Sequence, residues 1–211
     1  MALDVVFVRE QLPEREVVWL ETTASTLLDA ARMAAAGCPG GTAVVAEEQT
    51  AGQGRHGRSW HSEKSSGLYL SVVLRPELPA GSILSITLAL GLAAQDAIDQ
   101  ATGVACELKW PNDLLAGGRK CAGILTQRRG AAVIAGIGIN VNQETFPEEL
   151  QGVATSLRMV SGRVQSREDL LVRVLLSVDR YMKLLQAKGS RWIIGQYSLA
   201  SRKGKDHAAR S

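Results

Sequence analysis

A glycine- and arginine-rich stretch, residues 49–60 (QTAGQGRHGRSW), lies between two apolar, β-branched runs, 41–47 and 67–75. Its three glycines match the pattern G-x-G-x-x-G, which in a Rossmann fold follows a strand and opens a helix. Here residues 61–66 lead into the second run, which reads as another strand. No acidic residue ends a second strand at the distance needed to bind a ribose. The stretch is therefore predicted to be a loop between strands, and a doubly wound dinucleotide-binding fold is excluded.

The same stretch predicts an anion-binding loop. Its glycines, Gly52, Gly54 and Gly57, let the backbone approach a ligand closely, and turns of this kind expose N–H groups that bind anions. Arg55 and Arg58 add positive charge with a geometry suited to phosphate or carboxylate. The alternative is a surface turn with solvated arginines, which the combination with three glycines and a tryptophan disfavours.

The rest of the chain predicts a mixed sheet covered by a few helices. Ser25 and Gly37 are typical cap and stop residues of a helix, and Ser166 with Asp169 resembles a capping box. The order of elements is not a regular alternation, so we predict an α/β (α+β) fold with hairpins. The predicted helices are 25–37, 82–100, 166–187 and 192–199, and the predicted strands are 41–47, 67–75, 105–109, 113–116, 120–127 and 131–141.

Composition and charge limit the function classes. The chain has 211 residues, of which 45% are hydrophobic and 21% charged, as is ordinary for a globular protein. A net charge of +3 does not by itself imply a nucleic-acid partner. The three cysteines lack metal-ligand spacing, and their odd number favours a reducing compartment. Because the sequence shows neither a signal peptide nor an apolar run of membrane-spanning length, we expect a cytoplasmic protein without a membrane partner.

A second motif, residues 109–113 (KWPND), combines a lysine, an asparagine and an aspartate around a proline, and residues 117–124 (GGRKCAGI) follow it. Asn and Asp supply the hard oxygen ligands that suit Mg²⁺ bridged to phosphates. The alternative is a turn in which Asn112 and Asp113 bind their own backbone, and taken alone the motif favours that alternative.

A third motif, residues 136–142 (GIGINVN), places glycines inside an apolar strand. Such glycines often mark the close approach of a ligand or of another backbone segment. Asn140 both donates and accepts hydrogen bonds, which suits an adenine or ribose edge. A bulge that ends in an asparagine turn is a close competitor.

Taken together, these stretches resemble the catalytic domain of biotin protein ligases, the biotin–[acetyl-CoA-carboxylase] ligases. The resemblance rests on the order and separation of residues 25–26, 47–60, 109–113, 119–124 and 136–140 and covers residues 17–200. It implies a mixed sheet with packed helices, related to class II aminoacyl-tRNA synthetases and lipoate ligases. It also implies that biotin is activated with ATP and Mg²⁺ to biotinyl-5′-AMP and then transferred to a lysine of a biotin carboxyl carrier protein.

The resemblance also implies roles for individual residues of all the motifs. The implied catalytic residues are Arg55, Lys120 and Lys109. Biotin binding is implied for Ser25, Thr26, Leu27, Gln49, Gln53, Gly54, Arg55, Lys120, Gly123 and Gly136. Nucleotide binding is implied for Gly52, Arg58, Asn112, Asn140 and Gly138, and magnesium binding for Asp113.

Two segments are candidate lids that would keep water away from the mixed anhydride. One is the loop 52–58, and the other is residues 144–154, with Phe146 and Leu150 as apolar anchors. An ordinary polar connection is the alternative for the second segment. Cys121 is interpreted as an inward strand residue rather than a nucleophile. Both Trp60 and Trp110 are assigned with equal weight to the pocket or to the core.

The sequence departs from the family pattern at four points. Gln53 stands where the loop usually has an arginine, and Leu27 stands where an asparagine usually follows Ser-Thr. No helix-turn-helix domain precedes the ligase pattern, so no DNA-binding repressor role is expected. The basic residues 201–211 lie where an SH3-like domain usually begins, and we expect them to be a tail after a catalytic domain that spans 1–200.

The expected partners are biotin, ATP and a carrier domain, with no DNA. Family members often form homodimers, but the sequence does not reveal an interface. Two alternatives stay open: a lipoate or octanoate ligase or transferase of the same fold, and a catalytically weak biotin-binding remnant. The ureido ring of biotin needs polar partners such as Ser25, Thr26 and Gln49, whereas a plain acyl chain does not, and this favours biotin.

Overall fold

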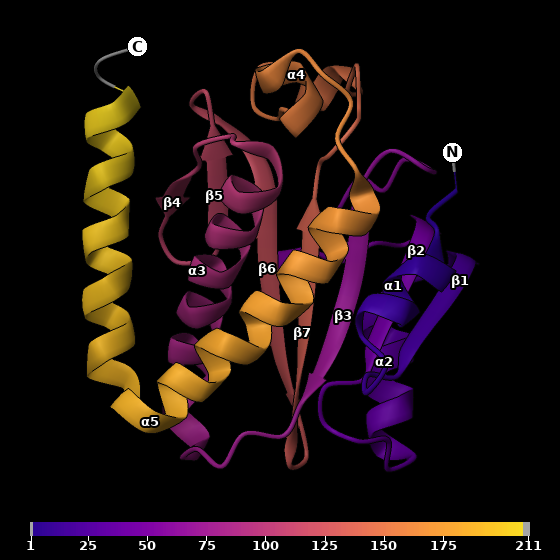
Figure 1. Ribbon diagram of the computed structural model, residues 1–211, viewed down its shortest axis with the longest axis vertical. Coiled ribbons are helices and arrows are strands. Elements are labelled where there is room, and N and C mark those ends of the chain that lie inside the picture. Colours follow the sequence, from indigo (N-terminus) through magenta and orange to yellow (C-terminus); the bar gives the residue numbers. More distant parts are fainter. Residues whose placement is uncertain (1, 209–211) are drawn as a thin grey trace.

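A seven-stranded mixed sheet forms the centre of the molecule (Figure 1). The computed structural model describes the backbone of residues 2–208, and the side chains in this range except at 80 and 202–208. The strands lie in the order β1-β2-β3-β7-β6-β5-β4; β1 and β2 run parallel, and the other neighbours are antiparallel. The strands are β1 (Val17–Thr23), β2 (Ala43–Gln49), β3 (Leu68–Leu74), β4 (Glu107–Lys109), β5 (Asp113–Ala116), β6 (Arg119–Arg129) and β7 (Ala132–Ile139). The predicted mixed sheet is confirmed.

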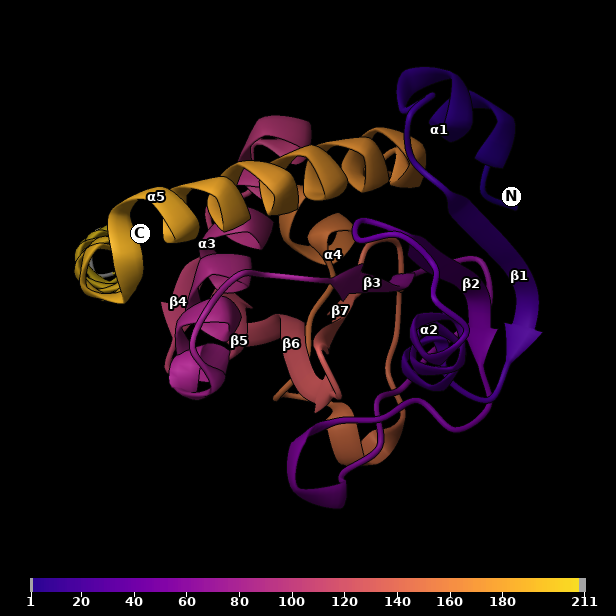
Figure 2. The same ribbon diagram turned by 90° about the horizontal axis from the view of Figure 1, so that it is seen from below.

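Helices cover both faces of this sheet, and Figure 2 shows α3 and α5 on one face and α2 on the other. None of the helices within residues 2–208 is both long enough and apolar enough to cross a membrane. The helices are α1 (Val5–Gln11), α2 (Thr26–Ala35), α3 (Ile83–Thr102), α4 (Leu157–Ser161) and α5 (Arg167–Ala208).

Strand β7 shows how the two faces differ. Side chains alternate between the faces of a strand, so Ile137 and Ile139 pack into the core under α3 and α5, whereas Ile134 packs under α2. The same alternation puts Gly136 and Gly138 on the α2 face. Because neither carries a side chain, the sheet is hollowed at this point.

Helix α5 consists of two helical parts that meet at a kink. Separate helices are predicted over residues 166–187 and 192–199, and the non-helical backbone of Gly189 lies between them. Gly189 has φ 78°, a left-handed conformation that favours glycine, and the helix changes direction there (Figure 1). The backbone of the expected tail continues α5 to Ala208, while its side chains from 202 onward and residues 209–211 lie outside the described part.

Three short elements were not predicted: α1, β1 and α4. The two helices have clear local signals, because Asp4 accepts a hydrogen bond from the Phe7 amide and Ser156 accepts one from the Met159 amide, both at 3.0 Å. Helices of seven and five residues give too few turns for a periodic pattern to stand out. Strand β1 lies at the edge of the sheet, paired only with β2 among the described strands.

A buried ion pair joins the start of α5 to the end of strand β2. Arg167 donates to Glu47 Oε2 at 2.8 Å, and Glu47 Oε1 also accepts a hydrogen bond from the Leu3 amide. Burial would raise the pKa of Glu47, but Arg167 and the Leu3 amide outweigh it and hold the pKa below its ordinary value. The pair therefore fixes three distant chain segments to one another.

Candidate active site

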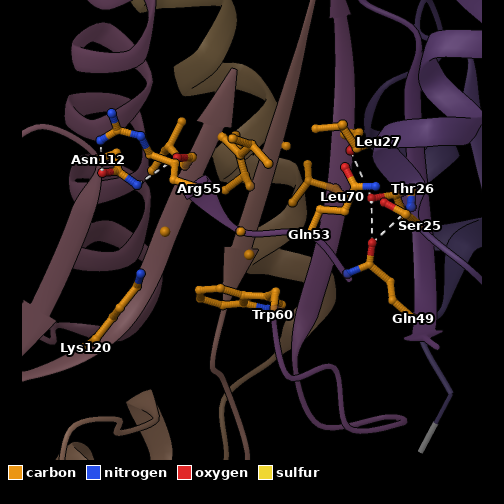
Figure 3. Close-up of a pocket in the computed structure, with 18 residues that line it drawn as sticks. Ser25, Thr26, Leu27, Gln49, Gln53, Arg55, Trp60, Leu70, Asn112 and Lys120 are labelled. Carbon is orange, nitrogen blue, oxygen red and sulfur yellow. Dashed lines mark hydrogen bonds between the residues drawn. The ribbon is translucent and has the colours of Figure 1, made fainter. Parts of the chain in front are cut away.

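A pocket opens on the α2 face of the sheet, between the start of α2, the loop 52–60 and the middle of β6 and β7 (Figure 3). Its empty space is about 470 Å³ with the solvent at its mouth included, which is a usual size for a small-molecule site. The pocket is lined by Ser25, Thr26, Leu27, Gln49, Gln53, Gly54, Arg55, Trp60, Leu70, Ser71, Asn112, Lys120, Gly123, Ile124, Leu125, Gly136, Ile137 and Gly138.

One end of the pocket is a network of uncharged polar groups. Gln49 Oε1 accepts hydrogen bonds from the Thr26 amide at 2.9 Å and from the Thr26 hydroxyl at 3.1 Å. The Thr26 hydroxyl also lies 2.9 Å from the Ser71 hydroxyl, and Gln49 Nε2 donates to Ser62 at 2.9 Å. These bonds fix the orientation of the groups before a ligand arrives, which lowers the entropy lost on binding.

Ser25 at this end differs from its predicted role as a helix cap. It occupies the N-cap position of α2, but its side chain makes no capping hydrogen bond. Its hydroxyl is buried and has no hydrogen-bond partner among the described residues. Because a buried polar group without a partner is costly, this hydroxyl is a natural contact for a polar group of a ligand.

Glycines and a tryptophan shape the wall between the two ends. The Trp60 ring lies so close to Gly138 that a Cβ there would be 2.5 Å from the ring, and a Cβ at Gly123 would be 3.0 Å from it. Near the polar end, a Cβ at Gly136 would be 2.9 Å from Leu27 Cδ1. Any larger residue at Gly138 would have to displace the ring.

The other end of the pocket is cationic (Figure 3). Lys120 Nζ lies 5.3 Å from the centre of the Trp60 ring and 2.7 Å from Asp113 Oδ1, and its side chain is 35% exposed. Arg55 donates to Asn112 Oδ1 at 2.8 Å, while Asn112 Nδ2 donates to the Ile124 carbonyl at 3.0 Å. The loop 52–60 is thereby tied to the turn that precedes β5, and two cations face the same space.

Comparison with known proteins agrees with this geometry. The family model for the biotin/lipoate A/B protein ligase family matches residues 19–144, which is more than half of the chain. The chain belongs to this family. Its fold, expected from the sequence to be that of the catalytic domain of biotin protein ligases, is confirmed.

Individual relatives include ligases from distant organisms. The Bifunctional ligase/repressor BirA of Bacillus spizizenii is 39% identical over 79% of this chain and 53% of that protein. The Biotin--[acetyl-CoA-carboxylase] ligase of Mycobacterium tuberculosis is 36% identical over 93% of this chain and 71% of that protein. A structure of the biotin protein ligase from Aquifex aeolicus, in complex with biotin and ATP, has a TM-score of 0.79 at 35% identity, and covers 86% of this chain and 76% of that one. The chain thus spans about half the length of the Bacillus protein.

Most of the predicted site residues of this family member meet in the pocket. Twelve of them line it, from the pair Ser25 and Thr26 at one end to Lys120 at the other. The predicted residues that do not line it are Gly52, Arg58, Lys109, Asp113 and Asn140.

Each of these five residues has another position. A Cβ at Gly52 would be 2.6 Å from the Trp60 carbonyl, so Gly52 allows the loop to close on itself. Lys109 is exposed, and Arg58 borders a neighbouring open cleft with Arg55 and Gln127. Asn140 is buried and donates to the Thr155 carbonyl at 3.0 Å. Their predicted roles in catalysis and nucleotide binding stay predictions.

Asp113 is engaged by Lys120 and is not part of a metal-ligand group. Within the described residues, no set of three or more His, Cys, Asp or Glu side chains is placed to hold a metal ion. These residues therefore do not form a protein cage for Mg²⁺, which commonly enters such sites on the phosphates of its nucleotide. The magnesium role of Asp113 stays a prediction.

The sequence reasoning missed five lining residues on the strands: Leu70, Ser71, Ile124, Leu125 and Ile137. All five lie in runs that were correctly predicted to be strands. Ser71 is a polar residue at the centre of the apolar run 68–74, and that signal was available in the sequence. Which strands lie side by side, however, is not visible in the pattern of a single strand.

Other expectations are settled by burial. Trp60 lines the pocket, whereas Trp110 lies outside it with 56% of its surface exposed. Cys121 is fully buried, 3.7 Å from the sulfur of Cys106. A hydrogen bond with Cys106 and burial raise the pKa of Cys121, so its interpretation as an inward strand residue holds.

The second candidate lid packs beside the pocket and does not line it. Phe146 is 7% exposed, and its ring lies 6.5 Å from that of His61. Further along, the amide of Lys120 donates to the Val153 carbonyl, and the amide of Thr155 donates to the Lys120 carbonyl, both at 2.9 Å. The segment 144–154 is thereby joined to β6 at the lysine of the pocket.

Proposed function

We propose that this chain activates biotin with ATP to biotinyl-5′-AMP and transfers the biotinyl group to a lysine of a biotin carboxyl carrier domain, as a biotin–[acetyl-CoA-carboxylase] ligase does. The observation that carries the proposal is the polarity of the pocket. Neutral hydrogen-bonding groups of Ser25, Thr26 and Gln49 stand at one end, and the cations of Arg55 and Lys120 stand at the other. A ligand with an uncharged polar ring and a carboxylate tail matches both ends.

In the first step, a carboxylate oxygen of biotin attacks the α-phosphorus of ATP, and the bond to pyrophosphate breaks. Two anions must meet, and their repulsion raises the barrier. Arg55 and Lys120 reduce this repulsion because their charges face the space where the reacting groups meet. ATP enters as its magnesium complex, and the ion belongs to this substrate.

In the second step, the amine of the acceptor lysine attacks the biotinyl carbonyl, and AMP leaves. The nucleophile belongs to the acceptor, so the chain needs none of its own. Water would compete with the amine for the anhydride, and the loop 52–60 lies at the pocket, where Gln53, Gly54, Arg55 and Trp60 line it. The three free cysteines fit a reducing compartment such as the cytoplasm.

The polar end of the pocket favours biotin over lipoate or octanoate. An acyl chain offers no hydrogen bond to the Ser25 hydroxyl, which is buried without a partner in the described structure. The ureido group of biotin does offer such bonds. A preference for an apolar acid would leave this hydroxyl unsatisfied in the complex as well.

The decisive experiment is incubation of the chain with ATP, Mg²⁺ and labelled biotin, followed by detection of biotinyl-adenylate and pyrophosphate. We expect both products, and calorimetric titration should show binding of biotin but not of lipoate. Biotin binding without pyrophosphate release would identify a biotin-binding module that lacks catalysis. Binding of lipoate in preference to biotin would overturn the proposed substrate.

A further inference from the structure

Trp60 packs the loop 52–60 against the strands β6 and β7 of the pocket. Its ring lies on Gly123 and Gly138, which are direct partners in the pairing of these two strands. A Cβ would be 2.5 Å from the ring at Gly138 and 3.0 Å from it at Gly123. Because carbon atoms in contact are about 3.5–4.0 Å apart, the ring occupies space that exists only where both residues lack a side chain.

Lys120 meets the ring at the same place. A Cβ at Gly123 would also be 3.2 Å from Lys120 Cε and 3.3 Å from Lys120 Nζ. The ammonium lies over the Trp60 ring, 5.3 Å from its centre, and a cation is attracted to an aromatic face within about 6 Å. Figure 3 shows the two side chains next to each other in the pocket. Gly123 is thus the point where the lysine, the ring and β6 come together.

The ring and Asp113 hold the ammonium in different ways. Asp113 Oδ1 lies 2.7 Å from Lys120 Nζ, and this carboxylate competes with a substrate anion for the same positive charge. The ring carries no net charge and attracts the ammonium through its quadrupole, so it leaves the charge and the three N–H donors of the lysine available to an anion. When Lys120 exchanges Asp113 for a carboxylate or phosphate, the ring contact therefore remains compatible with the new partner.

The position of the ring depends on the path of the loop. The Trp60 amide donates to the Gly52 carbonyl at 2.8 Å, which joins the two ends of the loop. Nearer its middle, the loop is tied to the turn before β5 by the hydrogen bond from Arg55 to Asn112. A change in the path of the loop would therefore move the ring away from Lys120.

We propose that Trp60 is a positioning residue for Lys120: the face of its ring, seated on two glycines of β6 and β7, holds the ammonium at the cationic end of the pocket for the anionic substrates. The inference rests on the proposed adenylation reaction and adds a residue to which that reaction assigned no role. The ring exchanges no proton and acts on the reaction through Lys120. Closure of the loop 52–60 and placement of the cation are thereby linked.

The first test is a double-mutant cycle of Trp60→Leu and Lys120→Ala in the full chain, measured as kcat/KM for adenylate formation. Trp60→Leu keeps an apolar side chain and removes the ring face, so kcat/KM should fall roughly threefold to thirtyfold. In the Lys120→Ala background there is no ammonium to hold, so the same substitution should cost clearly less. Urea denaturation shows whether each variant folds. Equal losses in both backgrounds would assign the ring to packing or to ligand contact and overturn the inference.

Fluorinated tryptophans at position 60 test the same contact while packing stays nearly unchanged. Fluorine withdraws electron density from the ring face and so weakens its attraction for a cation. We expect kcat/KM to decline stepwise as fluorine atoms are added, and this decline should be absent in Lys120→Ala. The same analogues at Trp192, which packs against the core on the other face of the sheet, are the control.

Two kinds of failure are distinguishable. An unchanged kcat/KM across the fluorine series in an active enzyme would refute the positioning role alone. If the unsubstituted chain forms no biotinyl-adenylate, the proposed function fails, and this inference fails with it.

Discussion

Two ion pairs of this fold have similar geometry and contrasting surroundings. Glu47 and Arg167 lie 2.8 Å apart with side chains 1% and 5% exposed. Asp113 and Lys120 lie 2.7 Å apart with side chains 25% and 35% exposed. In the first pair the carboxylate also accepts a hydrogen bond from a backbone amide. In the second pair the ammonium lines the pocket.

The difference teaches that burial, rather than distance, decides what an ion pair does. Arg167 cannot leave Glu47 without abandoning a charge in the core, so this pair holds the fold together. The Lys120 ammonium is a compact charge on a flexible stem at the edge of a cavity, so it can exchange Asp113 for a substrate anion. The first pair should therefore control stability and the second should control activity.

The largest effect is expected when the buried pair of Arg167 and Glu47 is broken. Arg167→Ala leaves Glu47 charged and buried, so the free energy of unfolding should fall by about 3–5 kcal/mol. Urea denaturation measures this loss, and Arg173→Ala, an exposed arginine on the same helix, is the matched control. A loss below about 1 kcal/mol, as is usual for surface pairs, would erase the contrast between the two pairs.

Breaking the pair of Lys120 and Asp113 at the pocket should instead affect the reaction. Lys120→Ala removes a cation that faces the developing charge, so adenylate formation should fall on the order of 10²–10³-fold. The rate of pyrophosphate release measures this effect, with Arg129→Ala, an exposed cation at the end of the same strand, as control. Unchanged rates would remove Lys120 from the mechanism.

The dependence of stability on pH should also separate the pairs. The pKa of Glu47 is lower in the folded chain than its ordinary value of 4.5. Its contribution to stability is thus fully present above that value and is lost as the pH falls through the folded-state pKa. Urea denaturation from neutral to acidic pH should show this decline, and Glu47→Gln should flatten it. A decline of the same size in Glu47→Gln would point to other carboxylates.

The smallest effect is expected on stability when the pair of Lys120 and Asp113 is broken. Lys120→Ala should change the free energy of unfolding by less than about 1 kcal/mol. At 1 M salt, where the Debye length is about 3 Å, even this difference should shrink. The loss caused by Arg167→Ala should persist at high salt, because buried pairs are screened far less. Equal salt sensitivity of the two losses would contradict the comparison.

Long, strongly periodic elements were predictable because their signals are local. The expected helix 82–100 corresponds to α3, and the expected strand 67–75 corresponds to β3. The two halves of α5 on either side of Gly189 were also predicted as separate helices, but whether a loop or a kink joins them was not. A glycine and a short polar stretch are compatible with both a loop and a kink, and only packing against α3 and β4 separates these outcomes.

The site was predictable in its chemistry and less so in its membership. Family resemblance led to the residues at both ends of the pocket, from Ser25 to Lys120. It also placed Asn140 and Lys109 there, although one is buried in a hydrogen bond to the Thr155 carbonyl and the other is exposed. Neighbouring residues on a strand point to opposite faces, so membership in a motif does not guarantee a place in the pocket.

The sequence by itself determined which stretches are flexible in conformation, which are apolar and where cations stand beside glycines, because these properties belong to residues and their near neighbours. Only the tertiary structure decided which partner each polar group has. Arg55 meets Asn112 across 57 positions and Arg167 meets Glu47 across 120. The order of strands and the depth of burial select these partners, and both arise from the packing of the whole chain rather than from any segment of it.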